Sequence, residues 1–382
     1  MKKKLMPTLL AGIIVALSSC GNDDPAPAAE GNDDAANLDY SAANAASWGN
    51  YMTQVSGLLK KDASDLYDAW TVSYDGGQPF ATSFKTHNGG DYSSALSCVN
   101  QIIEGCADIA NEVGTAKIGD PYNLYVSGQT QKALYAVESW YSWHSRDDYT
   151  NNIYSIRNAY YGSLDGSTVN TNSISALMAV VNPALDTEVK SAINAAAAAI
   201  QAIPQPFRNN INSAEARQAM SACGDLEEVL TNKLAPAVAA LGNDSRLQGI
   251  VDNFVDNVVL PTYSELKDKN VALHNAVAAF QAAPSNNAFR TACNAWLVAR
   301  EPWEKSEAFL FGPVDGLGLD PNMDSWPLDQ DAIVNILMSG NFDDLNWIDG
   351  DDDDRIESVQ SVRGFHTLEF LLFKDGQPRT IE

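Results

Sequence analysis

Apolar residues recur every three or four positions through most of the chain after Tyr40, a spacing that predicts amphipathic helices. The clearest stripes run from Trp48 to Trp70 and from Leu96 to Val113. Shorter stripes lie within residues 153–160, 186–203, 226–241, 247–258, 271–280, 289–297 and 354–373. We identify no convincing alternation of apolar and polar residues of the kind that marks a half-buried strand. The pattern predicts an all-α protein.

Short connections between about eight to ten such helices predict antiparallel bundles, because each helix buries one stripe and four helices enclose a core. A chain of 382 residues has the length for two such bundles. Gly242 and Asn243 provide a helix-stop signal. We therefore expect one bundle over residues 38–242 and a second over residues 243–382.

The N-terminus has the pattern of an export signal. Three lysines precede an apolar stretch that is too short to span a bilayer. The stretch ends in Leu17-Ser18-Ser19-Cys20, which resembles a lipobox, so we expect residues 1–19 to be removed and Cys20 to carry a lipid anchor. An ordinary signal peptide is the alternative. Residues 20–37 are predicted to form a flexible acidic tether, and an outer-membrane lipoprotein on the cell surface or the periplasmic face is expected.

Charge and cysteine content narrow the function further. The chain has 49 acidic and 24 basic residues, a net charge of −25, which argues against a nucleic-acid partner. The four cysteines after the export signal lack the spacing of a structural zinc site. We expect buried free thiols, with a long-range pair such as Cys106–Cys223 as the alternative; the four are Cys98, Cys106, Cys223 and Cys293.

The predicted C-terminal helix contains the sharpest chemical signal. His366 and Glu369 are three positions apart and therefore project from one helical face. The helix is apolar nearly all round, which indicates burial. A buried imidazole and carboxylate need partners, which a metal ion, an arginine or a closed hydrogen-bond network can supply. Gly364, one turn earlier, would let a neighbouring backbone approach closely.

A second cluster places Arg300, Glu304 and Glu307 on one stripe of a helix that Pro302 is expected to kink. Carboxylates that interrupt an apolar stripe are typical of a polar pocket inside a helical bundle. An exposed ion pair between Arg300 and Glu304 is the alternative.

Two further sets of polar residues are candidates for lining the same pocket. Asp329 follows the second cluster, where capping of the next helix is an equally good explanation. Ser145, Asp148 and Asn152 face one way at helical spacing, and helix capping accounts for these residues nearly as well.

Gly364-Phe365-His366-Thr367-Leu368-Glu369 resembles the GxHxxE motif of the imelysin family, and residues 300–313 and 326–329 resemble other segments of that family. The motif lies at the end of this chain, whereas family members usually carry it mid-chain. Residues 66–70 and 142–153 resemble the segments that normally follow it. The sequence therefore resembles a circularly permuted imelysin-like protein.

The resemblance implies two fused four-helix bundles with a pocket at their interface, a role in bacterial iron uptake and a peptidase label. It places the metal ligands at His366, Glu369, Glu304 and Glu307. It also implies that the pocket is lined by Asp329, Arg300, Ser145, Asp148, Asn152 and Gly364. One imidazole with several carboxylates suits iron, with zinc or calcium as alternatives.

These observations favour a lipid-anchored envelope protein that binds a metal ion or a small metal-containing ligand. Other components of iron uptake are its expected partners. A zinc peptidase is the first alternative, but it needs three protein ligands, an open position and a general base, and the HxxE pattern supplies only two residues. A scaffolding or adhesive lipoprotein with a purely structural polar cluster is the second. We therefore lean towards a protein without catalytic residues.

Overall fold

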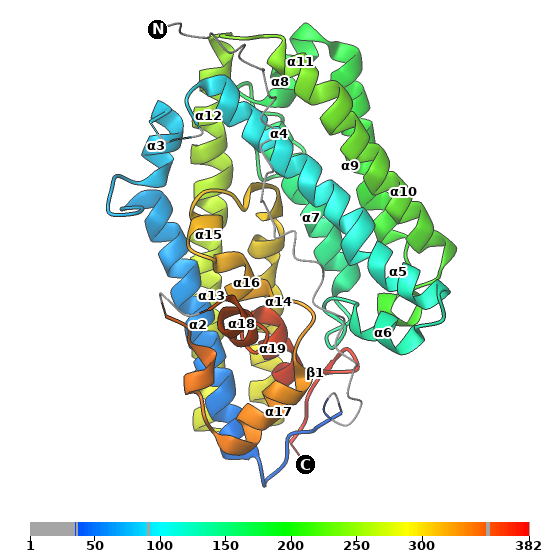
Figure 1. Cartoon of the computed structure of the whole chain (residues 1–382), viewed down its shortest axis with the longest axis vertical. Helices are drawn as coiled ribbons and strands as arrows, with labels where there is room; N and C mark the ends of the chain where they lie inside the picture. The colour runs from blue at the N-terminus through cyan, green and yellow to red at the C-terminus, as the bar shows by residue number, and fades with distance from the viewer. Residues whose placement is uncertain (1–34, 36, 89, 91, 349–351, 382) are drawn as a thin grey trace, which may run out of the picture.

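The computed structural model describes residues 35, 37–88, 90, 92–348 and 352–381, which form helices joined by short connections (Figure 1). Cys20 and residues 1–19 lie outside the described residues, as does most of the predicted tether. The predicted all-α class is confirmed. Within the described part of the chain, no helix has both the length and the apolar character that crossing a bilayer requires.

The α-helices are α2 (Ala45–Thr71), α3 (Phe80–Thr86), α4 (Ala95–Glu112), α5 (Gly119–Val126), α6 (Thr130–Tyr135), α7 (Ser145–Tyr161), α8 (Ile174–Val181), α9 (Pro183–Gln201), α10 (Ala214–Val229), α11 (Ala235–Ala239), α12 (Arg246–Phe254), α13 (Leu260–Ala282), α14 (Asn286–Glu304), α15 (Pro313–Gly316), α16 (Leu319–Asp324), α17 (Gln330–Ser339), α18 (Asp353–Gln360) and α19 (Gly364–Leu372). The π turns are η1 (Val113–Lys117), η3 (Leu230–Leu234) and η4 (Val255–Val259). The 3₁₀ turns are η2 (Phe207–Asn209), η5 (Glu307–Phe309) and η6 (Asp343–Leu345). A short antiparallel hairpin, which the sequence did not indicate, pairs β1 (Phe373–Lys374) with β2 (Gln377–Pro378).

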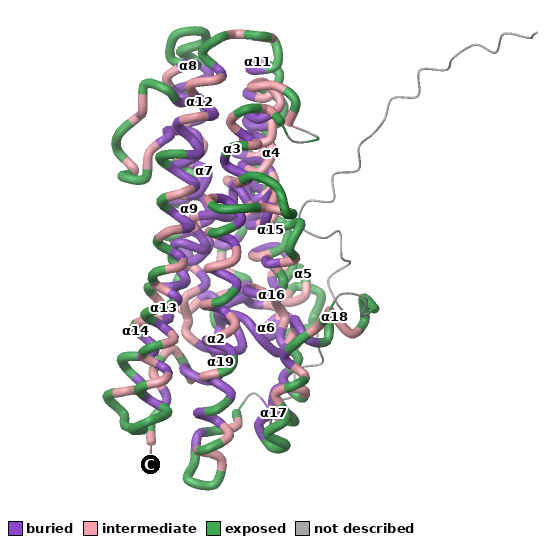
Figure 2. The backbone as a smooth tube through the Cα atoms, turned by 90° about the vertical axis from the view of Figure 1, so that its left-hand side faces the viewer, coloured by how far each residue is buried: buried purple, intermediate pink, exposed green. Residues whose placement is uncertain are grey.

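The long helices form two groups. Helices α4, α7, α9 and α10 pack together, and α2, α13, α14 and α19 form the second group (Figure 1). The expected boundary near residue 242 does not coincide with this packing, because α2 comes from the beginning of the chain and packs against α13 and α19. Contacts of α7 with α14, and of α4 with η5, join the groups. Buried segments therefore run through both groups and across their junction (Figure 2).

Helix α19 is surrounded by the other helices of its group. The indole of Trp48 in α2 donates to the carbonyl of Leu371 in α19, and the indole of Trp296 in α14 donates to the carbonyl of Phe365. Every residue of α19 is buried. The predicted burial of this segment is confirmed, and helices from both ends of the chain provide it.

A single helix was expected over residues 354–373, but the chain breaks between α18 and α19. Gly364 adopts φ +84°, in the left-handed region that disfavours other residues. A Cβ atom built there would lie 2.5 Å from the carbonyl oxygen of Met323 in α16. The expected close approach of a neighbouring backbone at Gly364 is confirmed, and it turns the helix towards α16.

Two prolines lie within helical runs. Pro261 lies in the first turn of α13, directly after the π turn η4. Because α12, η4 and α13 follow one another without a gap, the helical run continues through Pro261. Pro302 lies inside α14, as predicted.

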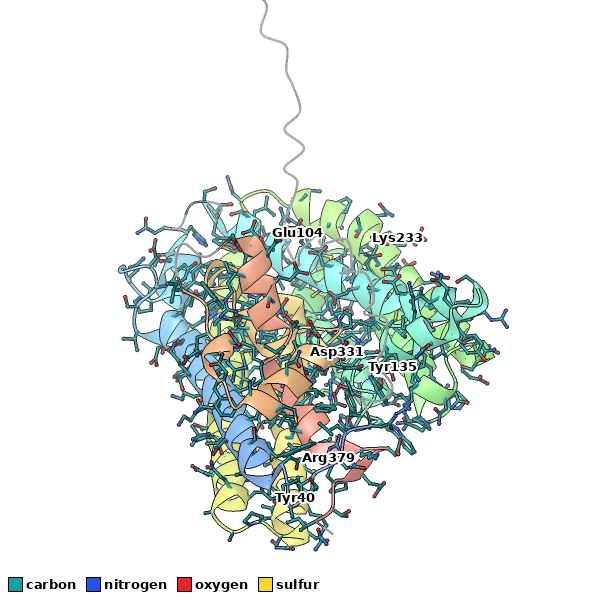
Figure 3. The ribbon with its side chains drawn as sticks, turned by 60° about the horizontal axis from the view of Figure 1, so that its bottom comes forward. Tyr40, Glu104, Tyr135, Lys233, Asp331 and Arg379 are labelled. Carbon is teal, nitrogen blue, oxygen red and sulfur yellow. The ribbon has the colours of Figure 1, made fainter. Side chains whose placement is uncertain are left out.

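The two ends of the described chain are joined by one buried arginine. Arg379 donates from Nη1 to the carbonyl of Leu38 and to Asp39 Oδ1, both at 2.9 Å, and from Nε to the carbonyl of Phe370. Figure 3 shows Arg379 and Tyr40 at the same end of the molecule. Adjacent ends are what a circular permutation requires. The permutation itself stays a prediction.

Cys98, Cys106, Cys223 and Cys293 are free and buried, as expected. Burial raises the pKa of Cys98 and Cys223 to about 12, so these thiols remain protonated. Packing, without disulfide cross-links among the described residues, therefore stabilises this fold.

Substitution of Gly364 by alanine should destabilise the protein more than substitution of Gly340, which has φ +66° but open space around it. Left-handed strain alone costs about 1 kcal/mol, whereas strain together with the collision at Met323 should cost about 3 kcal/mol. Urea unfolding of the two variants measures the difference. Equal losses would show that the approach to α16 is not constrained.

Candidate functional site

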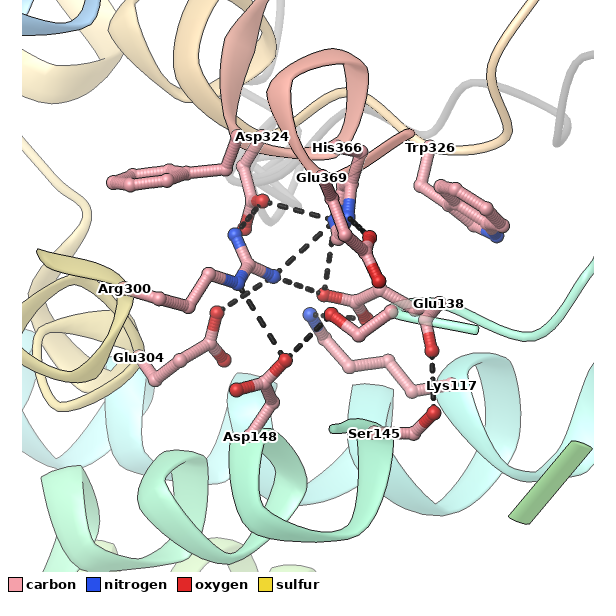
Figure 4. Close-up of polar contacts among 12 residues, drawn as sticks. Lys117, Glu138, Ser145, Asp148, Arg300, Glu304, Asp324, Trp326, His366 and Glu369 are labelled. Atoms are coloured by element: carbon pink, nitrogen blue, oxygen red, sulfur yellow. Dashed lines mark hydrogen bonds and ion pairs between the residues drawn. The ribbon is translucent and has the colours of Figure 1, made fainter. Parts of the chain in front are cut away.

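A fully buried arginine lies where the two helical groups meet. The guanidinium of Arg300 in α14 pairs with Asp324 at the end of α16 and with Glu304 one turn ahead, the latter at 2.7 Å. It also lies 2.6 Å from Glu138 Oε1 and 3.5 Å from Asp148 Oδ2 (Figure 4). Because four carboxylates from separate parts of the chain share one cation, Arg300 connects α14 to α7, α16 and the segment before α7.

The motif histidine contacts the same carboxylates. Nε2 of His366 lies 3.1 Å from Asp324 Oδ1 and 3.4 Å from Glu138 Oε1. Nδ1 lies 3.1 Å from Glu369 Oε2, and Glu369 Oε1 accepts from the backbone N–H and the hydroxyl of Ser142, each at 2.7 Å. Burial and Arg300 oppose protonation, but Asp324 and Glu138 outweigh them and raise the pKa of His366 well above its usual value. Carboxylates therefore hold the imidazole from both sides and favour its protonated form.

A second carboxylate group adjoins the first. Oxygens of Glu304, Glu307 and Asp324 lie within 4.8 Å of one another, and so do the ligand atoms of Glu138, Asp324 and His366. Asn152 Nδ2 donates to Glu304 Oε2 at 2.6 Å. Asp324 belongs to both groups. We call the six residues Arg300, His366, Glu138, Asp324, Glu304 and Glu307 the central cluster.

The central cluster opens onto a cavity of about 580 Å³. Ala116, Leu124, Ala136, Trp326 and Pro327 provide its apolar lining. Its charged and carboxamide lining residues are Glu112, Lys117, Asp120, Asn123, Gln129, Glu138, Glu307, Asp320 and Asp324. Glu138, Glu307 and Asp324 therefore face both the cluster and a space that a small molecule or a hydrated ion can enter.

Carboxyl groups outnumber cations in this region, and their pKa values divide accordingly. Burial raises the pKa of Glu304 and Glu307 well above the usual range, and burial with Asp324 nearby raises that of Asp320 to about 7. Burial also opposes ionisation of Glu138, but Lys117, His366 and Arg300 outweigh it and lower its pKa. Burial therefore disfavours ionisation of these carboxyl groups, a cost that an added cation would offset.

Most of the predicted site residues come together here. His366, Glu304, Glu307, Arg300, Asp148 and Asn152 meet at the cluster. Glu369 was predicted to be a metal ligand. It lies instead on the far side of the imidazole, where its Oε2 contacts Nδ1 of His366. Gly364 supports the site through its approach to Met323.

Two predicted pocket residues have other roles. Asp329 is exposed, and its Oδ1 accepts from the N–H of Ala332, so it caps α17 and lies outside the cluster. The capping explanation is the correct one for this residue. Ser145 donates from its hydroxyl to the carbonyl of Glu138 at 2.5 Å. It therefore fixes the backbone that carries a cluster residue and does not itself face Arg300.

Sequence reasoning missed Glu138, Asp324 and Lys117. Glu138 lies in the irregular segment between α6 and α7, where no helical periodicity shows which side chains face inwards. Lys117 ends a π turn, whose extra residue breaks the 3.6-residue register. For Asp324 the available signal was its position two residues before Trp326-Pro327, which begins a segment that the family resemblance had already marked.

Comparisons with known proteins agree on one relationship. The family model Peptidase_M75, described as imelysin, matches residues 24–232 and 259–382. A crystal structure described as an imelysin peptidase, from Bacteroides ovatus, is 62% identical with a TM-score of 0.90 and is matched over 91% of this chain and 100% of its own. Iron-regulated protein A of Synechococcus elongatus is 31% identical over 158 residues, 41% of this chain. That alignment spans 36% of the relative's length.

Replacing Arg300 by methionine should destabilise the protein by about 3–5 kcal/mol, because the buried carboxylates lose their shared counter-ion. The freed carboxyl groups would have folded pKa values above their unfolded values. Their destabilising effect is full at alkaline pH and recedes as pH falls through those values into the acidic range. Thermal unfolding across this range measures the change.

Arg290 to methionine on the same helix is the matched control, because Arg290 is exposed and its guanidinium donates to the carboxamide of Asn287, away from the cluster. It should change stability little at any pH. A pH-independent loss in the Arg300 variant would contradict the electrostatic explanation.

Proposed function

The chain belongs to the imelysin family, and from that premise we propose that its central cluster binds a metal ion, iron in the first place, in an iron-related role. The relationship to iron-regulated protein A supports the choice of metal. The observation that carries the proposal is the meeting of His366 Nε2 with oxygens of Glu138 and Asp324, all within 4.8 Å, beside a cavity. One imidazole with carboxylates is a donor set that suits iron.

The contacts around these donors support the proposal of a metal site. Metal-binding histidines commonly donate their second ring N–H to a carboxylate, which orients the ring. Glu369 provides this contact to His366, and Ser142 fixes Glu369 in turn. We therefore propose Glu138, Asp324 and His366 as ligands and Glu369 as the residue that positions the imidazole.

Charge balance supports cation binding as well. Glu304 and Glu307 form the adjoining group with Asp324, and burial raises the pKa of both carboxyl groups, so an added cation would ease their ionisation. Metal binding would release the Nε2 proton of His366 and would compete with Arg300, whose Nη2 lies 3.2 Å from that nitrogen. Binding should therefore strengthen as pH rises.

We further propose that the protein acts in the cell envelope, anchored to the membrane through Cys20. The pattern of residues 1–20 supports this location. Other iron-uptake components are the proposed partners, and the cavity has room for a small metal-containing ligand as well as for a bare ion.

Titration calorimetry with Fe²⁺ under anaerobic conditions tests the site. Glu138 to glutamine, Asp324 to asparagine and His366 to alanine should each weaken binding by at least about tenfold, and Glu369 to glutamine by roughly tenfold through loss of ring orientation. Asp329 to asparagine is the matched control, because asparagine also caps a helix and the residue lies outside the cluster. Absence of binding by the parent protein would refute the proposal.

A zinc peptidase is the second candidate, favoured by the cavity beside the three donors. Three protein ligands with one open side are the arrangement of a catalytic zinc site. Cleavage of a denatured protein substrate should then require zinc, stop with a chelator and disappear in the His366 to alanine variant. Cleavage that survives this substitution would exclude the cluster as its source.

A further inference from the structure

Lys117 is a cationic residue that the proposed metal site does not use. It ends the π turn η1, which follows Glu112 at the end of α4. Residues five apart lie over one another in a π turn, because its hydrogen bonds join residues i and i+5. This register places the ammonium of Lys117 3.6 Å from Glu112 Oε1.

The same ammonium contacts carboxylates from two other parts of the chain. It lies 3.1 Å from Glu138 Oε2 and 3.9 Å from Glu307 Oε1. Its side chain is 10% exposed and lines the cavity. Figure 4 shows it beside Glu138, next to the cluster. A tethered cation therefore occupies the space between three acids.

Two of these acids are shared with the candidate metal groups. Glu138 faces Arg300 and His366 through Oε1 and faces Lys117 through Oε2. Glu307 belongs to the group with Glu304 and Asp324. Lys117 therefore contacts one member of each group.

We propose that Lys117 is a tethered cation that competes with the metal ion for Glu138, one of the proposed ligands, and so sets the affinity of the central cluster. The inference rests on the proposed function. A lysine ammonium is a compact charge on a flexible four-carbon stem, and the adjoining cavity gives it room to swing away. Two cations held by the same carboxylates repel each other, so metal binding should require this movement.

A purely structural ion pair makes the opposite prediction. Loss of a structural pair would loosen Glu138 and Glu307, and metal affinity would fall or stay the same. Loss of a competing cation would leave these acids uncompensated, and metal affinity would rise. The sign of the change therefore separates the two roles.

The test compares Mn²⁺ binding by calorimetry at pH 7 in the parent chain and in variants. Lys117 to methionine keeps the length of the side chain and removes its charge, and it should bind at least about tenfold more tightly. Lys117 to arginine keeps the charge and should stay within about twofold of the parent. Lys233 lies at an exposed position (Figure 3) and pairs with Glu188. Its replacement by methionine should leave metal affinity unchanged.

A second measurement uses the parent chain, in case the methionine variant does not fold. Lysines are acetylated with and without Mn²⁺, and mass spectrometry measures the rate at each lysine. The rate at Lys117 should increase when Mn²⁺ is bound, whereas the rate at Lys233 should not change. An unchanged rate at Lys117 in the metal-bound protein would overturn the inference.

The outcomes distinguish this inference from the proposed function. Binding by the parent with equal or weaker binding by Lys117 to methionine overturns the role of Lys117 alone. Binding by the methionine variant alone supports the role of Lys117 and shows that the parent site is closed to this ion. Binding by neither protein overturns both.

Discussion

The burial of one guanidinium at the junction of two helical groups is the constraint on which the rest of the structure depends. A buried arginine is tolerated only when carboxylates compensate it, and Arg300 finds four of them. These carboxylates belong to α7, α14, α16 and the segment before α7. The charge requirement therefore fixes how the groups meet, and the cavity with its acidic lining follows from that arrangement.

Regular and irregular elements contribute differently to the site. Long helices supply Arg300 and Glu304, whose positions follow from packing of the apolar stripe. The turn-rich segment before α7 supplies Glu138, and the π turn after α4 supplies Lys117. Glu138 belongs to one of the two groups of potential ligands, and Asp324 belongs to both. Helical packing gives the site its rigidity, while the irregular segments determine how many acids face one another.

The sequence was most informative where a pattern of residues has a single physical explanation. The stripe from Trp48 to Trp70 predicted α2, and the apolar surroundings of His366 predicted its burial. Glu138 could not be found, because an irregular segment has no period from which to infer direction. The pairing of α2 with α13 is a contact between distant parts of the chain, and no local pattern shows it. Asp329 was misassigned because a cap and a pocket residue look alike in sequence.

The position of α19 has a consequence for the order in which the molecule is made. Trp48 near the start of the chain donates to the backbone of α19, which lies near its end. A polypeptide synthesised from its N-terminus has α13 available as a partner of α2 before α19 has been made, so the side of α2 that packs against α19 is covered later. His366 and Glu369 are synthesised with α19. Arg300 and its acidic neighbours therefore exist in the nascent chain before the imidazole that lies between Asp324 and Glu369.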